Sequence, residues 1–194
     1  MEALRIILDE HQALAALLHA LRFMLKEISA GRLEPDLRLL EAMIHYLDAY
    51  PEKRHHPKED FLFERLKART EEGAAALARL EMQHAGAPAR IHALEDAVRA
   101  YAADATRLPE LVKAFDVYAE FYRNHMLLEE SGVLPLARQH LTPDDWVEVD
   151  QVFAQDPDPM AGMTAPPEDF AALFSRLVAA TPAPLGLGGG PFKG

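Results

Sequence analysis

The most constraining feature of this sequence is the spacing of its apolar residues, which recur at intervals of three and four through four long stretches. This spacing places them on one face of an α-helix, so each stretch predicts an amphipathic helix. The predicted helices cover residues 2–30, 36–70, 74–104 and 109–131. Four long helices joined by short connections favour an antiparallel bundle, and no segment alternates as a strand does. The predicted fold is therefore all-α, an up-down four-helix bundle with a short C-terminal helical extension.

Prolines and glycines mark where these helices bend or end. Two prolines, Pro51 and Pro57, predict a bend in the second helix around residues 51–57, because an internal proline removes a backbone donor and kinks a helix. The third helix has a weak point at Gly86 and Pro88. The fourth is expected to end in a turn after Gly132.

The chain divides into a bundle over residues 1–155 and an extension over residues 156–194. The bundle includes a short helix from 143 to about 154, because Thr142 followed by proline and two acids is a typical helix start. The extension reads as the linker DPDPMAGMTAPP, a helix at 168–180 and a flexible Gly/Pro-rich tail. We expect that helix to cover part of the bundle, but a role in dimerisation is equally open, and so is the oligomeric state.

Composition excludes several classes of function. No apolar run approaches the roughly 20 residues that cross a bilayer, and the N-terminus lacks a basic leader, so we expect a cytoplasmic protein. The net charge of −11 argues against nucleic acid or an anionic membrane as partner. The chain has no cysteine, which excludes thiolate ligands, so any metal must be held by nitrogen and oxygen.

Two histidines with an acid four residues later lie on inward faces. Residues four apart share one face of a helix, so each pair aims an imidazole and a carboxylate at the same point. The faces continue into apolar residues, because Phe63 and Val133 follow the two acids at the same interval. The inward pairs are His55 with Glu59 and His125 with Glu129.

The remaining histidines have structural interpretations. The His56 and Asp60 pair is rotated about 100° from its neighbour and is therefore predicted to face solvent. The His140 and Asp144 pair straddles a predicted helix start. A further set of residues is expected to have only ordinary surface or core roles: His19, His45, His92, Tyr46, Tyr118 and Tyr122.

Two buried carboxylates that face each other repel, and each is costly unless it is paired or binds a metal. Two further histidines, His11 and His84, lie on the inner stripes of the first and third helices. The resulting four histidines and two glutamates suit a two-metal site with terminal imidazoles, bridging carboxylates and open positions for a small ligand. Such ligands favour iron or manganese, with zinc also possible. The alternative is that each histidine is a hydrogen-bonded core residue.

Four segments together resemble a known family: DEHQALAALLHAL, HHPKEDFLFERL, LEMQHAGAPARIHAL and YRNHMLLEESGVLPLA. They are similar, in the same order, to the four helices of a bacterial hemerythrin-like (HHE cation-binding) domain. The resemblance covers about residues 1–155 and implies a bundle around a non-haem di-iron centre. It implies two iron ions, with manganese or zinc as alternatives, bridged by Glu59 and Glu129. The implied ligands are His11, His55, Glu59, His84, His125 and Glu129.

The ligand pattern distinguishes branches of that family. Oxygen-carrying hemerythrins have a second histidine one turn after the helix-three ligand, where this chain has Pro88. Their last helix carries HxxxxD, where this chain has His125 and Glu129. The set of four histidines and two glutamates is more similar to the branch linked to nitric oxide response and repair of iron centres.

Three functions follow as hypotheses. The first is a di-iron protein that binds or reduces a small diatomic or peroxide ligand (dioxygen, nitric oxide or peroxide) as a sensor, scavenger or redox protein. Binding is favoured over catalysis, because turnover needs an outside electron donor of unknown identity. The second is iron storage or delivery. The third is a metal-free helical interaction module.

Overall fold

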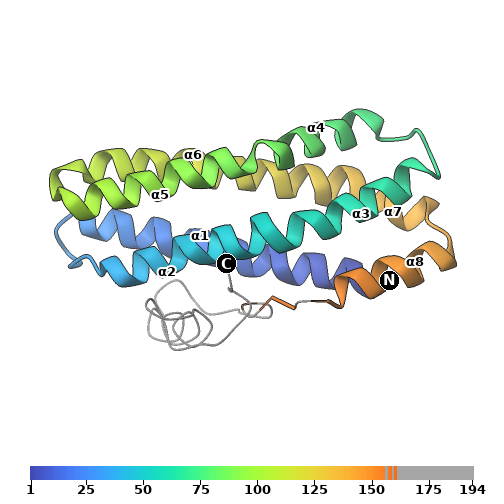
Figure 1. Ribbon diagram of the computed structural model, residues 1–194, viewed down its shortest axis with the longest axis horizontal. Helices are drawn as coiled ribbons and strands as arrows, with labels where there is room; N and C mark the ends of the chain where they lie inside the picture. The colour runs from blue at the N-terminus through green and yellow to red at the C-terminus, as the bar shows by residue number, and fades with distance from the viewer. Residues whose placement is uncertain (156, 159, 161–194) are drawn as a thin grey trace.

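The computed structural model describes residues 1–155, 157, 158 and 160, and shows four long helical rods lying side by side (Figure 1). The first rod is α1 (Glu2–Ser29). The second consists of α2 (Leu37–Leu47), the π-helix η1 (Asp48–His55) and α3 (His56–Lys67), and the third consists of α4 (Ala74–Ala85) and α5 (Ala87–Ala103). The fourth consists of α6 (Leu108–Leu128), the π-helix η3 (Glu129–Val133) and α7 (Leu134–His140). A 3₁₀ turn, η2 (Ala105–Arg107), precedes α6, and α8 (Pro143–Phe153) packs against α1 and α3. The predicted all-α bundle is confirmed.

The second and fourth rods each contain a π-helix followed by a proline. The predicted bend at residues 51–57 is the widened turn of η1, in which the N–H of His56 donates to the carbonyl of Pro51. Pro57 follows as the second residue of α3, and Pro135 is likewise the second residue of α7. A proline cannot donate to the preceding turn and its ring crowds that turn, which favours a local widening of the helix.

The predicted turn after Gly132 is wrong. The chain does not reverse there but continues from α6 through η3 into α7, which ends at His140. The glycine is accommodated inside the widened π turn, so the fourth rod is longer than the apolar pattern indicated. The reversal comes later, before α8, where Thr142 and Asp145 form a capping box that begins this helix.

The core is divided into two apolar clusters with a polar layer between them. One cluster holds the C-terminal part of α1 together with α2, α5 and α6, and the other holds the N-terminal end of α1 together with α3, α4, α7 and α8. On every rod the polar layer falls between the residues of the two clusters. It therefore lies near the middle of the bundle, where apolar packing on both sides separates it from bulk water.

The C-terminal extension is described only at residues 157, 158 and 160. Met160 is fully buried against the first cluster, so the chain returns to the bundle after α8. The rest of the predicted linker, the predicted helix at 168–180 and the predicted tail lie outside the described residues. Among the residues that the structure describes, no helix is long and apolar enough to cross a membrane.

Candidate metal centre

The polar layer contains all six residues that the sequence singled out. They come from four rods: His11 from α1, His55 and Glu59 from the second rod, His84 from α4, and His125 and Glu129 from the fourth. All six side chains are buried, and the two glutamates are 0% exposed. The structure therefore brings the six residues together, because four helical rods place them at one level of the bundle.

The Nε2 atoms of the four histidines converge on the two carboxylates. His55 Nε2 lies 2.5 Å from Glu59, and His84 Nε2 lies 3.4 Å from the other oxygen of the same carboxylate. His11 Nε2 lies 3.4 Å from both Glu59 and Glu129. His125 Nε2 is 3.8 Å from Glu129 and 4.0 Å from Glu59. Glu59 thus stands at the centre of the group.

The Nδ1 atoms of the same histidines donate outward to four polar residues that the sequence analysis missed. His11 donates to Glu130 at 2.8 Å, His55 to Glu10 at 2.5 Å, His84 to Asp60 at 2.6 Å and His125 to Gln83 at 3.0 Å. When the imidazole is neutral, as a metal ligand must be, a histidine that donates from one ring nitrogen presents the lone pair of the other, which fixes both the tautomer and the orientation of the ring.

These four supporting residues form a closed ring around the bundle. Each lies on a rod next to the histidine it holds: Glu10 of α1 supports the second rod, and Asp60 of α3 supports the third. Gln83 of α4 supports the fourth rod, and Glu130 of η3 supports the first. A signal was present in the sequence, because each supporting residue is the immediate neighbour of one of the six predicted ligands.

The prediction that His56 faces solvent is wrong. Its side chain is 4% exposed, and its ring stacks on that of His84 with centroids 4.1 Å apart. His55 and His56 are both buried although they are adjacent, because η1 ends between them and its wider turn brings consecutive residues inward. Its predicted companion Asp60 is partly exposed, and it supports His84 rather than pairing with His56.

Several buried atoms of the cluster have no hydrogen-bond partner within the described part of the chain. They are Nε2 of His55, His84 and His125, Oε2 of Glu59, and both carboxylate oxygens of Glu129. Buried polar atoms are almost always paired, so an inward-facing group of unpaired imidazole nitrogens and carboxylate oxygens is expensive without a cation. The donor set is that of a divalent transition metal, and these residues therefore fit one.

Ligand atoms in the cluster form two overlapping groups. In one, atoms of His11, His55 and Glu59 all lie within 4.8 Å of one another, and in the other, atoms of His56, Glu59, His84 and His125 do so. Glu59 belongs to both groups. The two groups, each of which could hold a metal ion, therefore share one carboxylate.

The charges of the cluster reflect strong coupling among buried groups. Burial alone would lower the pKa of His55, but Glu59 and Glu10 outweigh it and raise that pKa to about 9. Burial is likewise outweighed at His84, where Asp60 and Glu59 raise the pKa to about 10. Burial and the neighbouring charge of Glu59 raise the pKa of Glu129 to about 7. Protonated histidines thus balance the buried acids, a role that a bound metal cation can take over.

A small cavity adjoins the His11 and His55 side of the cluster. It has a volume of about 10 Å³, near the lower limit for one water molecule. Its wall includes Tyr46 and Asp158, whose side chains join through a hydrogen bond of 2.6 Å from the tyrosine hydroxyl. A residue beyond α8 therefore closes the space next to two of the candidate ligands.

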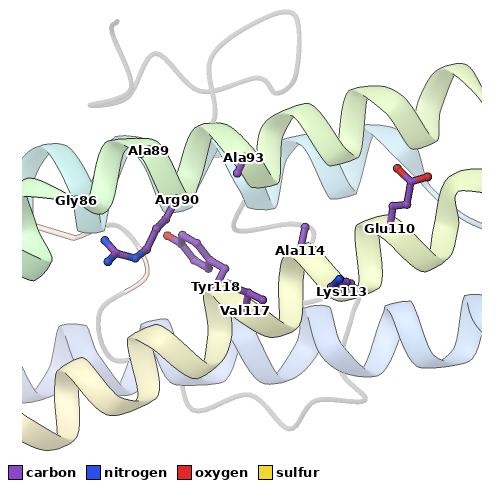
Figure 2. Close-up of a pocket in the computed structure, with 9 residues that line it drawn as sticks. All are labelled: Gly86, Ala89, Arg90, Ala93, Glu110, Lys113, Ala114, Val117 and Tyr118. Atoms are coloured by element: carbon purple, nitrogen blue, oxygen red, sulfur yellow. The ribbon is translucent and has the colours of Figure 1, made fainter.

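A larger groove of about 540 Å³ lies between α5 and α6 (Figure 2). Its lining is mostly aliphatic and carries no histidine. Tyr118 links the groove to the cluster, because its ring lines the groove while its hydroxyl donates to Glu52 at 3.2 Å. The groove has no group of metal-binding residues, so the candidate centre remains the buried cluster.

Comparison with known proteins agrees with this geometry. A family model described as "Hemerythrin HHE cation binding domain" matches residues 2–137, a range that contains all six predicted ligands as well as His56. Corresponding searches of curated proteins and of solved structures found no match.

Proposed function

The chain belongs to the hemerythrin HHE cation-binding family, and we propose that it is a non-haem di-iron protein that binds a small ligand such as dioxygen, nitric oxide or peroxide. His11 and His55 would hold one iron, and His84 and His125 would hold the other. Glu59 and Glu129 would lie between the two ions as bridging ligands. Manganese and zinc are the alternative metals for the same donors.

The observation that carries this proposal is that the two ring nitrogens of each histidine have different surroundings. In all four, Nδ1 donates to a supporting residue while Nε2 faces Glu59 or Glu129. A core histidine without a ligand would gain by pairing both nitrogens, whereas a metal ligand needs one of them free of hydrogen. The unpaired inward atoms of both glutamates favour the same interpretation.

When bound, a pair of irons supplies one-electron redox changes and open coordination positions for a small ligand. The chain's own residues orient the donors, because the supporting ring fixes each imidazole before any metal arrives. The two apolar clusters limit access of water to the site. The cavity beside His11 and His55 is close in size to a single water molecule.

We propose binding, in a sensor or scavenger, as the primary role. The chain has no cysteine, so no redox-active thiol stands beside the cluster to supply electrons. Repeated reduction of a ligand would need an outside electron donor. Iron storage or delivery is the competing role for the same residues, and it requires a site that releases iron readily.

The experiment is to measure metal content by mass spectrometry on protein purified without chelators, and to record absorption of a reduced sample before and after air or nitric oxide is admitted. Two irons per chain with a ligand-dependent near-ultraviolet band would support the proposal. Iron that is removed readily by a chelator, without ligand-dependent spectra, would favour storage or delivery. Protein of normal stability that takes up no stoichiometric metal would contradict both and leave a helical interaction module.

A further inference from the structure

His56 shares the environment of the four predicted ligand histidines. It is buried in the polar layer, its ring stacks on His84, and its centroid is 5.3 Å from that of His125. One of its nitrogens lies within 4.8 Å of ligand atoms of Glu59, His84 and His125. His56 is therefore a fifth imidazole in the cluster, and it lies beside His84 and His125.

The outward nitrogen of His56 faces a carboxylate, as those of His11, His55 and His84 do. Its Nδ1 lies 3.3 Å from a carboxylate oxygen of Glu52. Glu52 is itself fixed, because its other oxygen accepts hydrogen bonds from the hydroxyls of Tyr118 and Tyr122. Because the Glu52 carboxylate favours a hydrogen on Nδ1, Nε2 of the neutral ring carries a lone pair.

The one contact at Nε2 does not satisfy that lone pair. The hydroxyl of Tyr122 lies 3.4 Å away, but it donates its single hydrogen to Glu52. A buried imidazole whose outer nitrogen is anchored and whose inner nitrogen lacks a donor has the arrangement of a metal ligand. It is also the arrangement seen at His84 and His125.

We propose that His56 is a third imidazole ligand of the ion held by His84 and His125, an inference that rests on the metal pair of the proposed function. The two metal positions are then unequal. Three histidines occupy the position between α3, α4 and α6, and only His11 and His55 occupy the other. The position with fewer protein ligands is the one beside the small cavity.

The experiment titrates the full-length, chelator-treated protein with cobalt(II) and follows the visible absorption, which reports the number of ligands around each ion. The test variants are His56→Phe, which keeps a ring between His84 and Tyr122 but has no donor nitrogen, and His56→Ala. One control accompanies them: His92→Phe, at an exposed histidine of α5. Circular dichroism checks that each variant is folded.

Wild-type protein and His92→Phe should bind two cobalt ions. Both His56 variants should keep one ion and bind the other about tenfold more weakly or worse, since even loss of a group that only supports a ligand costs this much. Added imidazole should restore the second ion in His56→Ala.

Two results would overturn the inference while leaving the proposed function intact. One is that wild type and both folded His56 variants bind two ions with equal affinity and the same spectrum. The other is that both His56 variants lose the second ion but added imidazole rescues nothing in His56→Ala, which would make His56 a structural support. If wild type itself fails to bind two ions, the proposed function fails and this inference fails with it.

Discussion

Glu130 accepts a hydrogen bond of 2.8 Å from Nδ1 of His11, although the two residues are 119 positions apart in the sequence. This contact joins the fourth rod to the first and closes the ring of supports that runs around the bundle. The ring makes the four histidines mutually dependent, because each rod carries both a candidate ligand and the support of a ligand on a neighbouring rod. The four histidines are therefore oriented correctly only when the four rods pack in this arrangement.

Replacing Glu130 with alanine should weaken metal binding without unfolding the protein. The substitution leaves all six candidate ligands in place but releases the ring of His11, and loss of such supports typically costs about 10- to 100-fold in metal affinity. Competition with a chromogenic chelator measures this affinity. Glu34→Ala, at an exposed glutamate far from the cluster, is the matched control. Equal affinities in the two variants would show that the ring is not needed to orient His11.

The two central glutamates should respond in opposite ways in the metal-free protein. Glu59 pairs with His55, His11 and His84, and these contacts hold its pKa well below the usual range although burial opposes this. Glu59→Gln should therefore destabilise the chelated protein by about 3 kcal/mol, since it leaves buried imidazolium groups without their partner. Glu129→Gln should instead be neutral or stabilising, because it removes a buried carboxylate whose oxygens lack hydrogen-bond partners within the described residues.

Chemical denaturation of the chelated proteins measures both effects, and metal content should fall in both variants. Destabilisation of similar size in the two would contradict the asymmetry. Retention of two metal ions by either variant would contradict its role as a bridging ligand.

The stability of the metal-free protein should fall as pH rises from 7 to about 9.5. The pKa values of His55 and His84 lie at about 9 and about 10 in the folded protein, above the ordinary value of 6.5. The folded state therefore binds more protons than the unfolded chain in this range, and the stabilisation is fully present below pH 6.5 and is lost as pH rises through the folded values. Thermal denaturation of chelated protein across this range measures the slope.

Two comparisons sharpen this pH prediction. The double variant His55→Gln, His84→Gln should have a flatter profile, because the titrating groups are gone. Metal-loaded wild type should also be flatter, since the metal has displaced the protons. A wild-type profile that is flat in the metal-free state would mean that these histidines are neutral there.

Replacing Pro57 with alanine should speed the loss of metal more than it reduces helicity. Pro57 follows η1 and occupies the second position of α3, so alanine would allow the wide turn that presents His55 and His56 to relax toward a regular α-helix. Pro109, the second residue of α6, is the matched control because it lies outside the cluster. Metal release to a chelator and far-ultraviolet circular dichroism are measured together, and parallel losses in both would count against this role for Pro57.

The sequence by itself determined the helices and the six central residues. Apolar spacing of three and four is a local property of an amphipathic helix, so the four rods and the inward direction of Glu59 and Glu129 could be predicted from it. His11 and His84 followed because they lie on the same stripes. The prediction of a turn after Gly132 was wrong, because this glycine lies inside the π-helix η3 and the chain does not reverse there.

Only the tertiary structure decided which groups surround these six residues. His56 was predicted to be exposed because 100° of rotation per residue holds for a regular α-helix, and the widening at η1 breaks that rule. The supporting ring of Glu10, Asp60, Gln83 and Glu130 joins different rods, so its pairings depend on which helices are neighbours and at what height. Helical periodicity fixes the face on which a side chain lies, whereas the residue it meets is fixed only when the rods pack together.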